Sequence, residues 1–186
     1  MFNGASSYRR FLNGDDNGLV EIVEEYKDGL ILFLNRYVSD IYVAEDLAED
    51  TFFKLVINKP RYVGDSSFKA WLYTIARNLA LNYLKKNSRM ISKDVCDMEN
   101  IPAEKNEIED AYFCEERKKY VNSAMKKLNL DYSTVLFLIY FEDFSIEQAA
   151  HIMKKSKRQI ENLLYRAKQS LKRELLKEGM TFEKWL

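Results

Sequence analysis

The sequence predicts an all-α protein made of two small helical domains joined by a linker, the C-terminal one a helix-turn-helix. Three observations lead to this prediction. Apolar residues recur at helical spacing through most of the 186-residue chain, and only two prolines and six glycines interrupt them. Hydrophobic residues make up 47% of the chain, which is enough for packed cores. The middle of the chain is acidic and its C-terminal third is basic, as expected for segments with different partners.

Residues 1–86 are predicted to form the first domain, from three helices. The first covers residues 19–37. The second begins near Asp40 and ends at Asn58, because Pro60 disfavours a helical residue before it. Ser66 or Ser67 can cap the third, whose apolar stripe includes Trp71. We therefore interpret Trp71 as a core residue. The opposite side of the third helix is expected to face outward, and it carries Lys69, Tyr73, Thr74, Arg77, Asn78, Leu81, Lys85 and Lys86.

Residues 87–111 are predicted to be an acidic linker, because helical periodicity fails there and Pro102 lies within it. Residues 87–116 carry nine acidic and three basic side chains, whereas residues 117–186 carry eight acidic and fifteen basic ones. The formal net charge of the whole chain is zero. A nucleic-acid partner is therefore indicated by the distribution of charge and not by its total.

Residues 112–178 are predicted to form the second domain, and residues 179–186 a tail. The stretch 132–141 is apolar on nearly every side, which is typical of a helix buried within its domain. Two short helices follow. Ser145 with Gln148, and Ser156 with Gln159, have the spacing of capping boxes at the two helix starts. Gly179 is expected to end the last helix.

The second helix of this pair has a polar side that suits the major groove of DNA. Opposite its apolar stripe lie Arg158, Asn162, Tyr165, Arg166, Gln169 and Arg173. Guanidinium groups and amides are the donors and acceptors that read base edges and contact phosphates. The alternative is a helical hairpin whose basic side only contacts water. The basic cluster at residues 154–158 and the short turn favour the helix-turn-helix.

The sequence does not indicate catalysis, a metal or a cofactor. Cys96, Cys114 and the single histidine, His151, cannot supply a four-ligand zinc site. We find no nucleophile with a neighbouring base, no phosphate-binding loop and no paired carboxylates that form a convincing active site. No apolar run approaches the length of a membrane span and no signal pattern precedes Tyr8, so we expect a cytoplasmic protein without a membrane partner.

Two separated segments resemble one family. AEDLAEDTFFKLV at 44–56 and FKAWLYTIARNLALNYLKK at 68–86 resemble region 2 of bacterial RNA polymerase sigma factors, and the helix-turn-helix resembles their region 4. With only these two domains and a short linker, the chain is similar to the extracytoplasmic-function (ECF) subfamily of the sigma-70 family. The resemblance implies a promoter-specificity factor that binds core RNA polymerase and promoter DNA and promotes transcription initiation. An anti-sigma factor is a common partner in this family.

The resemblance also implies a role for particular residues. The clamp of core polymerase would be bound by Glu45, Asp46, Glu49, Asp50 and Phe53, and the polymerase flap by the apolar helix at 132–141 and its neighbours. The −10 element would be recognised by Arg61, Tyr62, Ser66, Arg77, Asn78, Asn82, Lys85 and Lys86. The −35 element would be bound by Lys157, Arg158, Gln159, Glu161, Asn162, Arg166, Lys168 and Arg173.

Two other classes of protein remain open at this point. A free-standing helix-turn-helix regulator would usually dimerise and would bind DNA tightly without polymerase. An interaction adaptor would use its acidic helix to bind a protein, and its basic domain would be incidental. Binding to DNA in the absence of polymerase separates the first from a sigma factor, and a transcriptional effect of substitutions at Arg158 and Asn162 separates the second.

Overall fold

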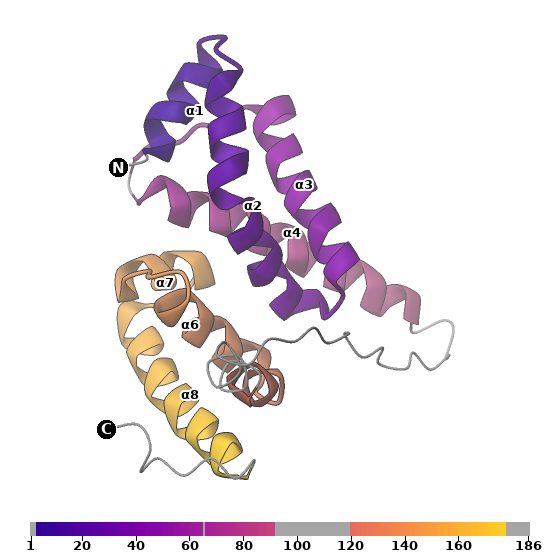
Figure 1. Ribbon diagram of the computed structural model, residues 1–186, viewed down its shortest axis with the longest axis vertical. Coiled ribbons are helices and arrows are strands. Elements are labelled where there is room, and N and C mark those ends of the chain that lie inside the picture. The colour runs from indigo at the N-terminus through magenta and orange to yellow at the C-terminus, as the bar shows by residue number, and fades with distance from the viewer. Residues whose placement is uncertain (1–2, 65, 92–119, 178–186) are drawn as a thin grey trace, which may run out of the picture.

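The computed structural model describes residues 3–64, 66–91 and 120–177, and within them every regular element is a helix, which confirms the predicted all-α class (Figure 1). Residues 120–126 are also helical. The named helices, in chain order, are α1 (Gly4–Leu12), α2 (Asn17–Val38), α3 (Ile41–Asn58), α4 (Phe68–Ile91), α6 (Leu130–Tyr140), α7 (Ile146–Met153) and α8 (Lys157–Lys177).

The N-terminal group of helices is built around α2, which packs against α1, α3 and α4. Its core contains fully buried aliphatic side chains from α2, α3 and α4. Asp40 caps α3 as predicted, accepting from the amides of Tyr42 and Val43, and Ser67 caps α4, accepting from the amide of Ala70. α4 continues to Ile91, past the boundary predicted at residue 86.

Helix α1 is a feature that the sequence reading did not predict. The side chain of Asn3 caps it by accepting from the amide of Ser6, and it buries Tyr8 and Phe11. α1 can lie against α2 only because residue 18 is glycine. A Cβ atom there would come within 2.2 Å of the carbonyl oxygen of Ser7.

The C-terminal group is arranged around α6, which contacts both α7 and α8. Residues 133–138 are buried on all sides of this helix, as its unbroken apolar pattern predicts. Both predicted capping boxes are present. Ser145 and Gln148 exchange hydrogen bonds of 3.2 and 2.8 Å, and Ser156 and Gln159 exchange bonds of 3.3 and 2.7 Å. The predicted end of the last helix at Gly179, the 179–186 tail and most of the 87–111 linker lie outside the described residues.

The two groups of helices pack directly on one another. α7 lies against α4, and α6 lies against α2 (Figure 1). The rings of Phe33 and Phe137 stack across the junction with centroids 6.4 Å apart. The expectation that Tyr73 faces outward is therefore wrong, since this side chain is completely buried. The periodicity of a single helix does not show that the second group of helices covers this side of α4.

Candidate nucleic-acid and protein interfaces

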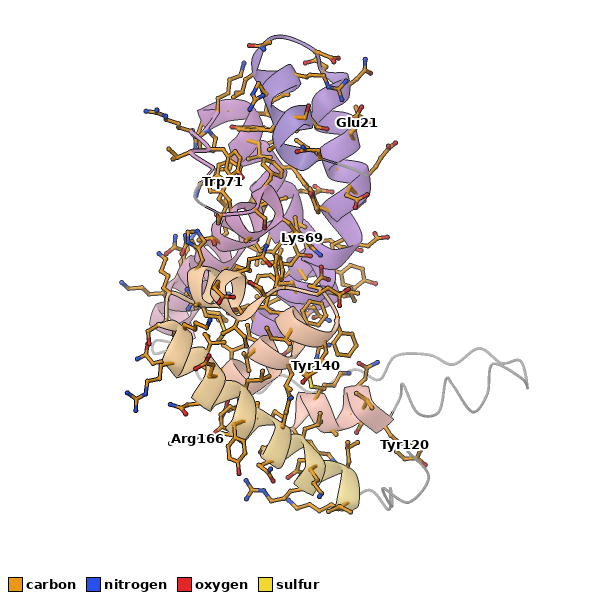
Figure 2. The ribbon with its side chains drawn as sticks, turned by 90° about the vertical axis from the view of Figure 1, so that its left-hand side faces the viewer. Glu21, Lys69, Trp71, Tyr120, Tyr140 and Arg166 are labelled. Carbon is orange, nitrogen blue, oxygen red and sulfur yellow. The ribbon has the colours of Figure 1, made fainter. Side chains whose placement is uncertain are left out.

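The side of α8 opposite its apolar stripe is open to solvent. Ile160 and Ala167 are buried against the rest of the second group. Arg158, Asn162, Tyr165, Arg166, Gln169 and Arg173 are all exposed, and Figure 2 shows Arg166 extending away from the molecule. The side chains that the sequence predicts for DNA are therefore exposed along one side of α8, as the recognition helix of a helix-turn-helix requires.

Several of the predicted −35 residues already have partners within the protein. Lys157 forms an ion pair with Glu147 of α7, and this hydrogen bond is the main reason that the pKa of Glu147 falls to about 2 and that the pKa of Lys157 is raised. The carbonyl oxygen of the Gln159 side chain is held in the capping box of α8. Lys168 lies 5.2 Å from the centre of the Tyr140 ring, whereas Glu161 is exposed.

The acidic side of α3 forms a second exposed surface. Glu45, Asp46, Glu49 and Asp50 all face solvent, and Phe53 beside them is 64% exposed. A hollow of about 240 Å³ lies next to them between α2 and α3, lined mainly by Val23, Ala48, Phe52, Phe53 and Val56. A carboxylate row beside an apolar hollow suits a partner helix that has apolar and basic side chains.

The loop between α3 and α4 is supported by an aromatic cluster, which we define as Tyr8, Tyr62, Phe68 and Trp71. Neighbouring rings in it have centroids 5.3–5.6 Å apart. Tyr8 donates a hydrogen bond of 2.8 Å to the carbonyl oxygen of Pro60. Tyr62 donates one of 2.5 Å to the carbonyl oxygen of Ser66. The cluster thus ties both ends of the loop to α1 and α4, and Trp71 packs against the core as interpreted from the sequence.

The predicted −10 residues fall into two sets. Arg61, Asn82, Lys85 and Lys86 are exposed, whereas Tyr62, Ser66, Arg77 and Asn78 are partly buried. The Nε atom of Arg77 is buried and has no hydrogen-bond partner among the described residues. Arg77 follows Tyr73 by one helical turn on α4, so it lies at the edge of the junction between the two helix groups.

The described residues contain no group of three or more His, Cys, Asp or Glu side chains that could hold a metal ion. His151 is exposed on α7, and Cys96 and Cys114 lie outside the described residues. Within the same ranges, no helix combines the length and the apolar character that crossing a membrane requires.

Residues at the junction between the helix groups were missed as functional candidates. Glu142, in the turn between α6 and α7, accepts a hydrogen bond of 2.7 Å from the hydroxyl of Tyr73 and pairs with Lys69 at 2.9 Å. Two signals in the sequence could have drawn attention to them. Tyr73 is an aromatic residue on a side of its helix that is otherwise mainly polar, and Glu142 stands between Phe141 and Phe144.

The chain resembles known proteins in both halves. The family model for Sigma-70 region 2 matches residues 22–90, and that for Sigma-70 region 4 matches residues 118–171. The ECF RNA polymerase sigma factor SigM of Bacillus subtilis is 30% identical over 154 residues, covering 82% of this chain and 91% of the relative. The RNA polymerase sigma-H factor of Pseudomonas aeruginosa is 28% identical over 174 residues, covering 89% and 90%.

Solved structures agree with these relatives. The sigma factor RpoE of Bartonella quintana, crystallised with the anti-sigma factor NepR, superposes with a TM-score of 0.65 at 26% identity, covering 84% of this chain and 95% of that one. The chain therefore belongs to the extracytoplasmic-function sigma factors of the sigma-70 family. Its function is that of a promoter-specificity factor, which binds core RNA polymerase and directs initiation at promoters with −10 and −35 elements.

Proposed function

We propose that this sigma factor contacts core polymerase and promoter DNA through three separate surfaces. The acidic side of α3 with Phe53 binds the polymerase clamp. The α3–α4 loop and the exposed end of α4 bind the −10 element, and the outer side of α8 binds the −35 element. The observation that carries the proposal is the exposure of both charged faces, one acidic and one basic, on helices whose other sides are buried.

For the clamp, the acidic face supplies charge complementarity and Phe53 supplies apolar area. Phe53 stands beside an apolar hollow, so a partner side chain can pack against both at once. The flap is proposed to meet the exposed end of α6, where Tyr140 and Phe141 are about half exposed. When it is bound to the clamp and the flap, the protein acts as part of the polymerase and performs no catalysis of its own.

For the −10 element, opening the duplex requires that bases leave the stack, and a capture site with nearby cations favours this. Arg61 at the loop and Lys85 and Lys86 on α4 provide the cations. Loss of one of these phosphate contacts is expected to weaken binding without changing sequence preference.

For the −35 element, Arg158 and Asn162 lie near the N-terminal end of α8, where base edges are within reach of a recognition helix. R158A and N162A should each reduce promoter affinity by about 1–3 kcal/mol if the residue reads a base. Run-off transcription with purified core polymerase detects the loss of affinity as reduced initiation. Glu174→Gln, further along α8 and outside the proposed surface, is the control that should initiate like the wild type.

The proposed clamp contact has its own test. Asp50→Lys should weaken the affinity for core polymerase, whereas Asp16→Lys, an exposed carboxylate at the start of α2, should not. Equal affinity for the two variants would contradict the assignment of α3. Tight and sequence-specific binding to duplex DNA by the free protein, with no initiation when core polymerase is added, would favour a free-standing regulator instead.

A further inference from the structure

We propose that a hollow beside the C-terminal end of α2 binds a small phosphorylated molecule of about nucleotide size, with Arg36 and Lys126 as the groups that hold its phosphates. The hollow has a volume of about 810 Å³ and lies between α2, residues 122–128 and the first turn of α6. None of its described lining residues is among those assigned above to the clamp, the −10 element or the −35 element. The site is therefore independent of those assignments, and its test needs neither polymerase nor DNA.

The strongest indication of an anion site is Arg36, a half-buried cation that lines the hollow. Its guanidinium carbon lies 4.9 Å from the centre of the Phe137 ring and 6.0 Å from that of Phe141. Burial lowers the pKa of Arg36, as expected for a charge that loses water and gains no counter-charge. Because removal of a charge from water is unfavourable unless an opposite charge replaces the water, a bound anion would stabilise this group.

Two other half-buried cations show what is missing at Arg36. The side chains of Lys69 and Lys155 are 32% and 31% exposed, and their ammonium groups lie 2.9 and 3.1 Å from a carboxylate oxygen. Neither Arg36 nor Lys126 forms an ion pair within the described residues. The described part of the lining also contains no Asp or Glu. Two positive charges thus face one hollow without an acid to balance them.

The helix ends at the hollow do not change the sign of its charge. The C-terminal end of α2 is negative and the N-terminal end of α6 is positive, each by about half an elementary charge, so the two largely cancel. Asp131 in the first turn of α6 is paired with Lys155. The full charges of Arg36 and Lys126 therefore make the hollow positive.

The donors around the hollow suit a phosphate better than a carboxylate. A guanidinium group can bind phosphate through two parallel hydrogen bonds, and an ammonium group adds a compact positive charge. Asn35, Ser39 and Asn122 bring further hydrogen-bonding side chains to the same walls. A phosphate group offers three strong acceptor oxygens, whereas a carboxylate offers two. The number of donors thus favours a phosphate, and the pair of cations favours a diphosphate.

The remaining walls favour a ligand with an organic part. Leu32, Met125, Leu128 and Leu130 supply apolar surface. The Oδ1 atom of Asn35 is buried and has no hydrogen-bond partner among the described residues, so it can accept from a hydroxyl or amino group of the ligand. The volume lies within the range of about 300–1,000 Å³ that is typical of small-molecule sites. A nucleoside diphosphate combines the charge, the donors and the apolar ring that these walls would recognise.

Isothermal titration calorimetry of the full chain with three probes tests the site. ADP carries both the phosphates and the organic part, pyrophosphate only the phosphates, and adenosine only the organic part. ADP should bind most tightly, pyrophosphate more weakly, and adenosine should give no measurable heat. The proposal is overturned if neither ADP nor pyrophosphate binds at millimolar concentration, or if adenosine binds as tightly as ADP. Binding of pyrophosphate without binding of ADP would overturn a ligand of nucleotide size.

Charge-removing variants test whether the probes bind in the hollow. R36Q and K126Q should each weaken the binding of ADP and pyrophosphate about ten- to hundredfold, the effect of losing a hydrogen bond to a charged group. K27Q removes a positive charge from an exposed residue of the same helix α2, outside this hollow, and should leave both affinities unchanged. Lys126 is exposed, so K126Q keeps the test valid even if R36Q alters the fold. Equal effects of K27Q and K126Q would refute the site.

A steric variant and a competitor complete the test. L32W adds volume at an exposed position of the wall without changing charge, and it should weaken the binding of ADP more than that of pyrophosphate. Equal weakening of both would contradict the placement of the organic part against the apolar wall. A polyglutamate peptide is the competitor. If the peptide binds in the wild type but not in R36Q, while ADP and pyrophosphate bind neither, the hollow is a surface for an acidic protein and the proposal fails.

Discussion

Replacing Tyr8 with phenylalanine should loosen the loop that we assign to the −10 element, although residue 8 lies far from that loop in the sequence. Tyr8 is fully buried, and its hydroxyl donates 2.8 Å to the carbonyl of Pro60. Y8F keeps the ring contacts with Phe68 and Trp71, so no cavity forms. The variant isolates this single hydrogen bond.

The expected cost of Y8F is about 0.5–1.5 kcal/mol of unfolding free energy, because a partly buried acceptor loses its donor. Denaturant unfolding measures the loss. Part of it should appear locally, as faster amide exchange in residues 61–64 and slower formation of the open promoter complex. Y42F is the matched control, since Tyr42 is 76% exposed and substitutions at such sites change stability by less than about 0.5 kcal/mol. If Y8F and Y42F behave alike, α1 does not support the loop and the reasoning fails.

Two other predictions concern caps and pH. S145A and S156A each remove a capping box and should each cost about 1 kcal/mol in denaturant unfolding; a loss below about 0.3 kcal/mol for both would show that packing alone sets the helix starts. Burial raises the pKa of Tyr8 and Tyr26 to about 12. Unfolded tyrosine ionises near pH 10, so the native state holds more protons between these values. Stability should be complete below about pH 10 and fall as pH rises towards about 12, and in Y8F the fall should be shallower.

The features that sequence analysis predicted well are those set by neighbours along the chain. The starts of α7 and α8 depend on residues three apart, and both capping boxes form as predicted. The buried character of α6 follows from its own composition. The exposed face of α8 follows from helical periodicity, because its apolar stripe has one core to cover and, among the described residues, no other helix group covers its opposite side.

Sequence analysis failed where contacts join distant residues. α1 was missed because it is short and its apolar stripe contains only Tyr8 and Phe11 as large residues, and its stability comes from packing on α2 and on the aromatic cluster. Tyr73 was assigned to the outward side of α4 because a single helix gives no sign that another group of helices will cover that side. Its partner Glu142 lies 69 residues away.

Local pattern was thus sufficient for the helical class, most helix boundaries, the helix-turn-helix and the two charged faces, since each depends on residues within a few turns of one another. Where the second helix group docks onto α2 and α4, a glycine, a carboxylate and two donors from three separate segments meet. Contacts between distant segments produce no periodic pattern in the sequence, because each contact stabilises the protein only after folding has brought its two residues together.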